Sequence, residues 1–373
     1  MKLVTPPYIA QLQPYVPGKP IETLQRELGL NDVVKLASNE NPLGPSPRAT
    51  EAIKAALGRL HRYPDGAAHD LTDRLARQWD VTADNVVLGN GSDDLIAMIA
   101  RAFLAPGDEV VVPQPSFLMY ALAAQWSGAR CASVALKSLT IDLAAMADAV
   151  SPASKIIFLC NPNNPTGTIF AKADFDRFLD RVPDDVMIVL DEAYAEFVRS
   201  DDFVSGADYI YRKRPIVTLR TFSKAYGLAG LRVGYGIMPA EVAQILHRVR
   251  DPFNVSIPAQ AGALAALDDH AHLLETRRVT HDGIAYLQNA LERLGLTSYP
   301  TEANFFLIDV KTEADRVYHQ LLREGVIARS MRAYGYPNFI RISIGRSSEN
   351  QRFIEALAKV LARVGQPLEA NTH

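Results

Sequence analysis

Short apolar runs recur through the first two thirds of the chain, and segments with helical periodicity separate them. The runs are nearly continuous rather than alternating, as in Lys155–Cys160 and Val186–Leu190. Continuous apolar strands are typical of a parallel sheet covered by helices on both faces, because neither face then meets water. We therefore predict an α/β fold with a mostly parallel seven-stranded sheet, built from Val86–Leu88, Glu109–Val112, Ala132–Leu136, Lys155–Cys160, Val186–Leu190, Ile216–Leu219 and Val233–Met238.

The two ends of the chain differ from this central pattern. Residues 1–35 are rich in proline and polar side chains, which predicts an extended N-terminal arm with a short amphipathic helix from Ile21. Residues 36–250 form the predicted large domain. Residues 251–373 are predicted to form a smaller α/β domain, packed with the arm, whose strands are Phe305–Val310, Val326–Met331 and Phe339–Ile344.

Composition narrows the class of protein. A chain of 373 residues is long enough for two domains, and a net charge of −3 gives no reason to expect nucleic acid as a partner. Two cysteines suit a reducing compartment, and no run is apolar and long enough for a signal peptide or a membrane span, so we expect a cytoplasmic protein. The only close histidine pair, His270 and His272, has no further ligand types at metal-binding spacing, so we expect no metal.

Polar clusters directly follow four of the predicted strands. GNGSDD follows Leu88, NPNNPTG follows Cys160, DEAY follows Leu190, and TFSK follows Leu219. Ligands bind at the carboxyl ends of the strands in such sheets. The four clusters are therefore predicted to form one site.

Lys224 suggests the chemistry of that site. A lysine that follows a buried strand loses its proton readily, because desolvation disfavours the charged amine, and a neutral amine forms an imine with an aldehyde. Ser223 and Arg232 lie close by in sequence and could hold a phosphate. An aldehyde and a phosphate occur together in pyridoxal 5'-phosphate (PLP). The alternative is a strand-to-loop turn that carries an exposed lysine.

Several other residues fit a PLP site, although each also has a purely structural reading. Asp191 ends the most apolar strand and needs a cationic partner, such as a protonated pyridine nitrogen, or else it caps a turn. Tyr194 and Asn164 could reach the phenolic oxygen of the ring. Phe117 could stack on the ring or belong to the core. The glycine-rich GNGSDD turn opens a helix and could bind an anion, or Ser92 or Asp93 could simply cap that helix.

Arg341 stands inside the predicted strand FIRISIG. Arginine is unusual inside a strand unless its guanidinium meets an anion with two acceptor oxygens. A substrate carboxylate is one candidate, and a structural salt bridge is the other.

Together, these motifs resemble a known family. TFSKAYGLAG, NPNNPTG and DEAY occur in the order and spacing typical of PLP-dependent aminotransferases of fold type I, and the resemblance runs from about Tyr15 to Arg346. Within the family, the chain is most similar to the subgroup that acts on histidinol phosphate. The segments similar to that subgroup are PYVPGKPIETLQRELG, KLASNENPLGPSP, RYPDG, GNGSDD and FIRISIG. The chain departs from it at Ser256, where asparagine is common; this change affects the substrate pocket or is neutral.

The resemblance implies a role for each candidate residue. Lys224 would attach the cofactor and move the substrate proton, and Asp191 would pair with the pyridine nitrogen. Tyr194 and Asn164 would hydrogen-bond the ring oxygen, and Phe117 would stack on the ring. The residues around the cofactor phosphate would be Gly91, Ser92, Asp93, Ser223 and Arg232, joined by Tyr63 of a partner subunit. The substrate residues would be Tyr15, Asn39, Arg329 and Arg341.

The implied protein is a homodimer that transfers an amino group between L-histidinol phosphate and 2-oxoglutarate in histidine biosynthesis. The products are imidazole-acetol phosphate and L-glutamate. Two other PLP enzymes remain open as alternatives: an aromatic-amino-acid aminotransferase, and a decarboxylase of an amino-acid phosphate. A DNA-binding regulator is disfavoured, because the residues before the fold lack a helix-turn-helix pattern, and a dehydrogenase is disfavoured, because the dinucleotide fingerprint is incomplete.

Overall fold

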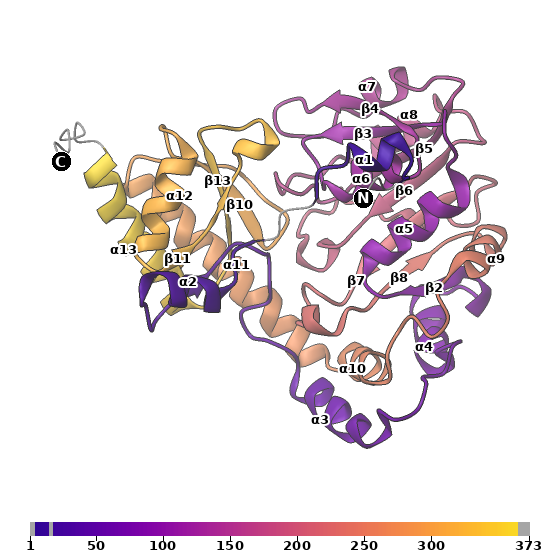
Figure 1. The fold of residues 1–373 in the computed structure, drawn as a ribbon, viewed down its shortest axis with the longest axis horizontal. Helices are drawn as coiled ribbons and strands as arrows, with labels where there is room; N and C mark the ends of the chain where they lie inside the picture. Colours follow the sequence, from indigo (N-terminus) through magenta and orange to yellow (C-terminus); the bar gives the residue numbers. More distant parts are fainter. Residues whose placement is uncertain (1–3, 15–17, 365–373) are drawn as a thin grey trace.

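A computed structural model describes residues 4–14 and 18–364 of the chain. Its large sheet has seven strands in the order β2-β8-β7-β6-β5-β3-β4, as Figure 1 shows. Neighbouring strands are parallel except at β8, which is antiparallel to both β2 and β7. The predicted seven-stranded, mostly parallel sheet is therefore confirmed. The strands are β2 (Val86–Gly89), β3 (Glu109–Gln114), β4 (Arg130–Ala135), β5 (Ser154–Cys160), β6 (Met187–Asp191), β7 (Ile216–Thr221) and β8 (Gly234–Ile237).

The central strands are apolar throughout because both faces of the sheet are covered. Along β5, Ile156 and Phe158 pack in one hydrophobic cluster, whereas Ile157 and Leu159 pack in another on the opposite face. The first cluster is closed by α5 (Ser92–Phe103), α6 (Met119–Trp126) and α9 (Ala240–Val249). The second is closed by α7 (Leu143–Asp148) and α8 (Lys172–Leu179).

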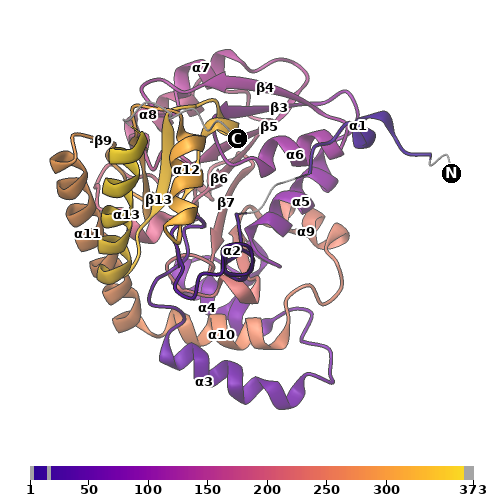
Figure 2. The same ribbon diagram turned by 60° about the vertical axis from the view of Figure 1, so that its left-hand side comes forward.

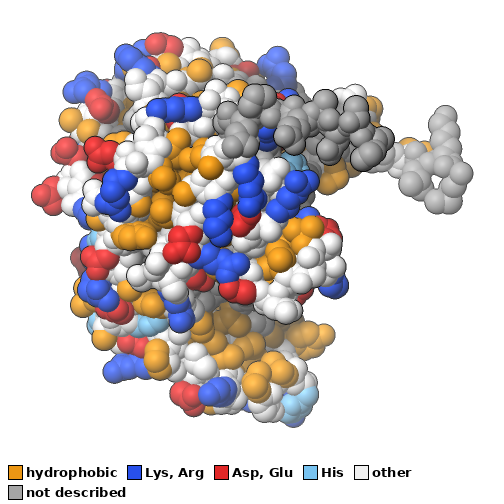
Figure 3. All heavy atoms as spheres, turned by 90° about the vertical axis from the view of Figure 1, so that its left-hand side faces the viewer, with side chains coloured by type: hydrophobic (Ala, Val, Ile, Leu, Met, Phe, Trp, Pro, Cys, Tyr) orange, Lys and Arg blue, Asp and Glu red, His pale blue; other side chains and the backbone are white. Residues whose placement is uncertain are grey.

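The smaller unit lies beside the large one and is built around a second sheet (Figure 1). This sheet is antiparallel, with the order β12-β13-β10-β9, and α11, α12 and α13 pack with it. Its strands are β9 (Thr297–Ser298), β10 (Phe305–Asp309), β12 (Arg329–Ser330) and β13 (Phe339–Ser343). The helices are α11 (His270–Arg293), α12 (Ala314–Arg323) and α13 (Ser347–Val364). Figure 3 shows that acidic and basic side chains are interspersed over this side of the molecule.

The predicted strand 326–331 is divided in the structure. Its first part, β11 (Val326–Ile327), pairs in parallel with β1 (Val34–Lys35), whereas its second part, β12, pairs with β13. The two parts therefore belong to different sheets. The N-terminal segment causes the division, because it supplies the partner strand for β11.

The N-terminal segment contacts both units. Helix α1 (Pro7–Ala10) packs on α6 of the large unit, where Figure 2 also places it. Helix α2 (Ile21–Leu28) instead buries Leu24 against Leu322 and Ile327 of the smaller unit. The segment thus bridges the two units, and its second half packs with the smaller unit.

The boundary expected at residue 251 does not agree with the packing of the next helix. Helix α10 (Ile257–Leu267) packs on α3 (Pro47–Ala56) and α4 (His69–Trp79), and its Ala259 lies in the same hydrophobic cluster as Val86. Helix α11 then packs Leu273 against that cluster and Ile284 in the core of the smaller unit. We therefore propose that the boundary falls inside α11. No helix within residues 4–14 and 18–364 is long and apolar enough to cross a membrane.

Candidate active site

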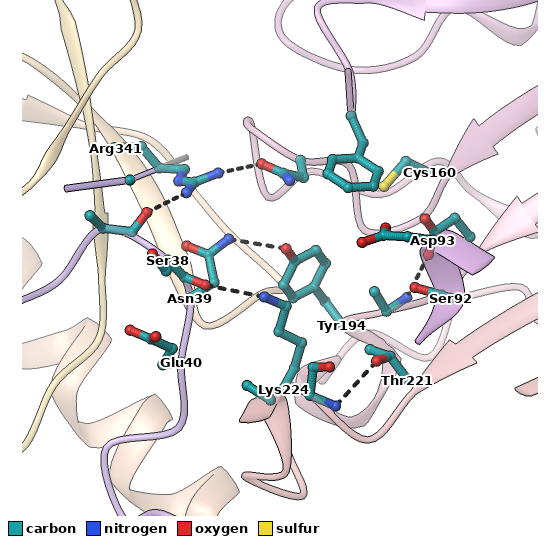
Figure 4. Close-up of a pocket in the computed structure, with 18 of the residues that line it drawn as sticks. Ser38, Asn39, Glu40, Ser92, Asp93, Cys160, Tyr194, Thr221, Lys224 and Arg341 are labelled. Carbon is teal, nitrogen blue, oxygen red and sulfur yellow. Dashed lines mark hydrogen bonds between the residues drawn. The ribbon is translucent and has the colours of Figure 1, made fainter. Parts of the chain in front are cut away.

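One cavity of about 240 Å³ lies where β5, β6 and β7 end, facing the smaller unit. The close-up in Figure 4 shows side chains from both units pointing into it. The structure brings together twelve of the residues singled out from the sequence. They are Asn39, Ser92, Asp93, Phe117, Asn164, Asp191, Tyr194, Ser223, Lys224, Arg232, Arg329 and Arg341.

Lys224 follows β7 and extends into the cavity. Its Nζ donates a hydrogen bond to the backbone oxygen of Ser38 at 3.1 Å and lies 5.8 Å from the centre of the Tyr194 ring (Figure 4). Burial, followed by the nearby charge of Arg341, lowers the pKa of the Lys224 amine to about 8. A large share of this amine is therefore neutral at mildly alkaline pH, and a neutral amine is a nucleophile and a base.

This pKa leads to a testable expectation for the cofactor-free protein. Competitive labelling with acetic anhydride should show that Lys224 reacts faster as pH rises and is half-maximal near pH 8. A lysine side chain free in solution, with a pKa of about 10.4, is the reference. An identical pH profile for Lys224 and the reference would mean that burial does not lower the pKa of the Lys224 amine.

Asp191 is buried at the end of β6, with 3% of its surface exposed. Its Oδ2 accepts a hydrogen bond from the Tyr120 hydroxyl at 2.7 Å, and its Oδ1 accepts one from the backbone N–H of Ala193 at 3.2 Å. Burial raises the pKa of the Asp191 carboxyl to about 6, although the Tyr120 hydrogen bond opposes this rise. Above that pH the carboxyl is an anion in a desolvated position, where a cationic ring nitrogen is a suitable partner.

The wall of the cavity between the two units is formed by four hydrogen-bonding side chains, those of Asn39, Asn164, Tyr194 and Arg341. Asn39 donates from Nδ2 to the Tyr194 hydroxyl at 3.0 Å. Arg341, on β13, donates to Oδ1 of Asn164 and to the backbone oxygen of Ala37, the latter at 2.7 Å. These bonds join the loops after β1, β5 and β6 to the second sheet, so the wall depends on the packing of both units (Figure 4).

An anion subsite lies at the start of α5. Gly91 precedes the helix with φ of 89°, and a Cβ there would lie 2.6 Å from Nη2 of Arg232. Arg232 donates to Oγ of Ser223 at 3.4 Å and pairs with Asp93 at 3.6 Å. Burial raises the pKa of Asp93, and Arg232 opposes that rise. Helix N–H groups, a hydroxyl and a guanidinium together suit a phosphate.

Two residues named in the sequence analysis, Tyr63 and Ser256, lie elsewhere. Tyr63 does not line the cavity of its own chain; it is 80% exposed and stacks on Phe253, with ring centres 4.7 Å apart. Tyr15 lies outside the described residues. Ser256 is the N-cap of α10, where it accepts from the backbone N–H of Ala259 at 3.4 Å. Serine and asparagine serve equally well at this position, so the helix cap explains the exchange.

Sequence reasoning missed other residues at the cavity. Tyr120 does not itself line the cavity but donates to Asp191, which does; it stands three residues after Phe117, a spacing that puts both on one face of a helix. Ser38 and Glu40 flank Asn39 in the loop after β1, and no pattern in the sequence indicated their roles. The remaining lining residues missed are Gly18, Ala37, Cys160, Ala193, Thr221, Ala229 and Tyr334. No cluster of three potential metal ligands occurs among the residues that the structure describes.

Comparisons with known proteins agree with this geometry. Residues 31–357 match the family model for aminotransferase class I and II. The chain is 48% identical over 355 residues to the histidinol-phosphate aminotransferase of Moorella thermoacetica, covering 95% of this chain and 92% of that protein. It is 49% identical over 358 residues to histidinol-phosphate aminotransferase 2 of Pseudomonas aeruginosa, with coverage of 95% and 97%.

A solved structure is similar over the same length. It is the histidinol-phosphate aminotransferase from Sinorhizobium meliloti in complex with pyridoxal-5'-phosphate, with a TM-score of 0.90, 29% sequence identity, and coverage of 96% of this chain and 97% of that one. This likeness confirms the fold type predicted from the motifs. Because the family model spans both units and the cavity between them, the chain belongs to the class I and II aminotransferases.

Proposed function

We propose that this chain is a PLP-dependent enzyme that transfers an amino group between L-histidinol phosphate and 2-oxoglutarate. One observation carries the choice of substrate. Arg329 on β12 and Arg341 on β13 are direct cross-strand partners, and both line the cavity. Like charges in directly opposite positions repel each other, so the pair favours a ligand with more than one negative charge, such as a phosphate monoester or a dicarboxylate.

The residues present fit PLP as the cofactor. The N-terminus of α5, Ser223 and Arg232 suit its phosphate, and the desolvated carboxylate of Asp191 suits a protonated pyridine nitrogen. Tyr194 and Asn164 would donate to the ring oxygen, with Phe117 against the ring. When bound, PLP withdraws electrons from the substrate and so acidifies its α-carbon.

Lys224 performs the proton transfer in this proposal. Its amine has a pKa of about 8, so its neutral form is available to take the proton from the α-carbon of the substrate. Its hydrogen bond to the Ser38 oxygen directs the amine into the cavity. The resulting ammonium could then deliver this proton to the aldehyde carbon of the cofactor. Water would release the oxo product, and 2-oxoglutarate would accept the amino group by the reverse steps, with Lys224 returning a proton to its α-carbon.

The two arginines bind the substrates in turn. Arg341 would hold the α-carboxylate of glutamate and 2-oxoglutarate, and its bonds to Asn164 and Ala37 already fix the direction of its guanidinium. Arg329 would hold the phosphate of histidinol phosphate. Phenylalanine and tyrosine carry no phosphate, so the arginine pair favours the phosphorylated substrate over them. The names of the relatives favour transamination over decarboxylation.

Comparing two substrates tests the proposal. With 2-oxoglutarate as acceptor, kcat/KM for L-histidinol phosphate should exceed that for L-phenylalanine by about a hundredfold, or roughly 3 kcal/mol of transition-state binding. An equal or reversed ratio would point to an aromatic aminotransferase. Release of carbon dioxide from an amino-acid phosphate, without amino transfer, would point to a decarboxylase.

We also propose that the enzyme is a homodimer working in a reducing cytoplasm. A group of apolar side chains is exposed around Tyr63: Leu57 is 51% exposed, Leu60 58%, Tyr63 80% and Phe253 46%. Exposed apolar groups of this kind suit a protein interface, across which Tyr63 would reach the cofactor phosphate of the partner. Sedimentation equilibrium should then give twice the mass of one chain. Both cysteines are free thiols, which suits a reducing compartment.

A further inference from the structure

Tyr120 donates a shorter hydrogen bond to the buried carboxyl group of Asp191 than the backbone N–H of Ala193 does, 2.7 Å against 3.2 Å. Its ring is 1% exposed and stacks almost parallel on Phe158 of β5, with ring centres 4.8 Å apart and planes 6° apart. Phe117, one turn earlier on the same segment, meets it edge-on at 5.6 Å. Because two rings confine it, the phenol cannot swing away, and its hydroxyl points at Oδ2 of Asp191 at 2.7 Å.

We propose that Tyr120 is a positioning residue that keeps Asp191 ionised and fixes the plane of its carboxylate. The proposal rests on the proposed function, because it assigns to Asp191 the pyridine nitrogen of PLP. Two donors hold the carboxylate from different sides: the Tyr120 hydroxyl on Oδ2 and the backbone N–H of Ala193 on Oδ1. A carboxylate has further acceptor positions, so a ring N–H can be added without displacing either donor.

The hydroxyl of Tyr120 is a permanent donor. Burial raises its pKa well above the ordinary value, and the charge of Asp191 adds to this effect, so it stays protonated throughout the working pH range. A neutral donor of this kind stabilises the ionised form of its acceptor and lowers the acceptor's pKa. Of the groups that lower the pKa of Asp191, Tyr120 has the largest effect.

Other groups around Asp191 do not take over this role. Asp93 at the start of α5 raises the pKa of Asp191, whereas Ala193 and Lys224 lower it less than Tyr120 does. The Cys160 thiol on β5 and the Tyr194 hydroxyl also lie near this carboxyl, and burial raises the pKa of both, so both stay neutral. Tyr120 is therefore the main group that offsets the cost of burying the charge.

The first test measures the pKa of the Asp191 carboxyl group directly, without substrate or cofactor. Carbon-13-labelled aspartate reports the titration of Asp191 by NMR, and the Asp191→Asn variant assigns its signal. Tyr120→Phe keeps the ring packing and should raise the pKa of Asp191 by about one to two units. Tyr235→Phe is the matched control, because it removes another buried hydroxyl, one that is bonded to Trp79. An unchanged Asp191 pKa in Tyr120→Phe would overturn the proposal.

The second test is a double-mutant cycle on PLP affinity. Tyr120→Phe should weaken PLP binding about tenfold in the otherwise unchanged chain but less than about threefold in the Asp191→Asn background, where no carboxylate remains to be held. Equal losses in both backgrounds would mean that Tyr120 acts only through packing and would overturn the proposal. Urea unfolding of each variant verifies that it folds.

Activity measurements separate this proposal from the choice of substrate. With whichever amino donor the enzyme uses, Tyr120→Phe should lower kcat and shift the acid limb of its pH profile to higher pH, with little change in KM. An unshifted acid limb would count against the proposal. The carboxyl titration and the PLP affinity involve no amino donor, so a different substrate would overturn the proposed function and leave this inference standing.

Discussion

Replacing Lys224 with alanine should lower the rate of amino transfer by roughly 10⁴-fold or more. The variant loses the amine that attaches the cofactor and the base that takes the substrate proton, and no other lysine lines the cavity among the described residues. Borohydride reduction followed by intact-mass analysis measures the loss of cofactor attachment, because only the unchanged chain should gain the mass of one PLP. The steady-state rate with 2-oxoglutarate as acceptor measures the loss of the base.

A matched control uses the same substitution at a distant lysine. Lys155 is exposed near the start of β5, the end of that strand opposite to the cavity. Lys155→Ala should keep both its activity and its covalent cofactor. Turnover by Lys224→Ala within tenfold of the unchanged enzyme would remove this lysine from the mechanism.

Replacing Arg329 with glutamine should lower kcat/KM for histidinol phosphate by about 100- to 1000-fold. The change removes the guanidinium proposed to hold the substrate phosphate, while its cross-strand partner Arg341 remains in place. Histidinol, which lacks the phosphate, serves as the comparison substrate. Its kcat/KM should change little, so the preference of the enzyme for the phosphorylated substrate should nearly disappear.

Arg332 provides the control for this second substitution. It lies three residues further along, is bonded to Glu313, and does not line the cavity. Arg332→Gln should leave the preference for the phosphate intact. If Arg329→Gln lowered kcat/KM for both substrates equally, Arg329 would support the fold of the pocket rather than bind the phosphate.

The sheet could be predicted from the sequence because its strands carry a strong local signal. Alternate residues of β5 enter clusters on opposite faces, so burial on both sides forces a continuous apolar run. The site could be located for a related reason. Asp191 and Lys224 each follow such a run, and the geometry of parallel strands then brings them to one edge.

The features that could not be predicted depend on contacts between distant parts of the chain. The break between β11 and β12 exists because Val326 pairs with Val34, and nothing local in either segment indicates that pairing. The packing of α10 on α3 is equally non-local. The role of Tyr120 could not be predicted, because an aromatic residue on the buried face of a helix usually belongs to the core. Only the fold shows that its hydroxyl donates to the carboxyl group of Asp191.

The transfer of nitrogen is the most direct test of the central claim. The enzyme, loaded with PLP, is incubated with imidazole-acetol phosphate and nitrogen-15-labelled L-glutamate, and the products are read by mass spectrometry. Labelled histidinol phosphate and an equal amount of 2-oxoglutarate should form. Label that stays in glutamate while the same preparation transfers it to phenylpyruvate would contradict the assignment to histidinol phosphate.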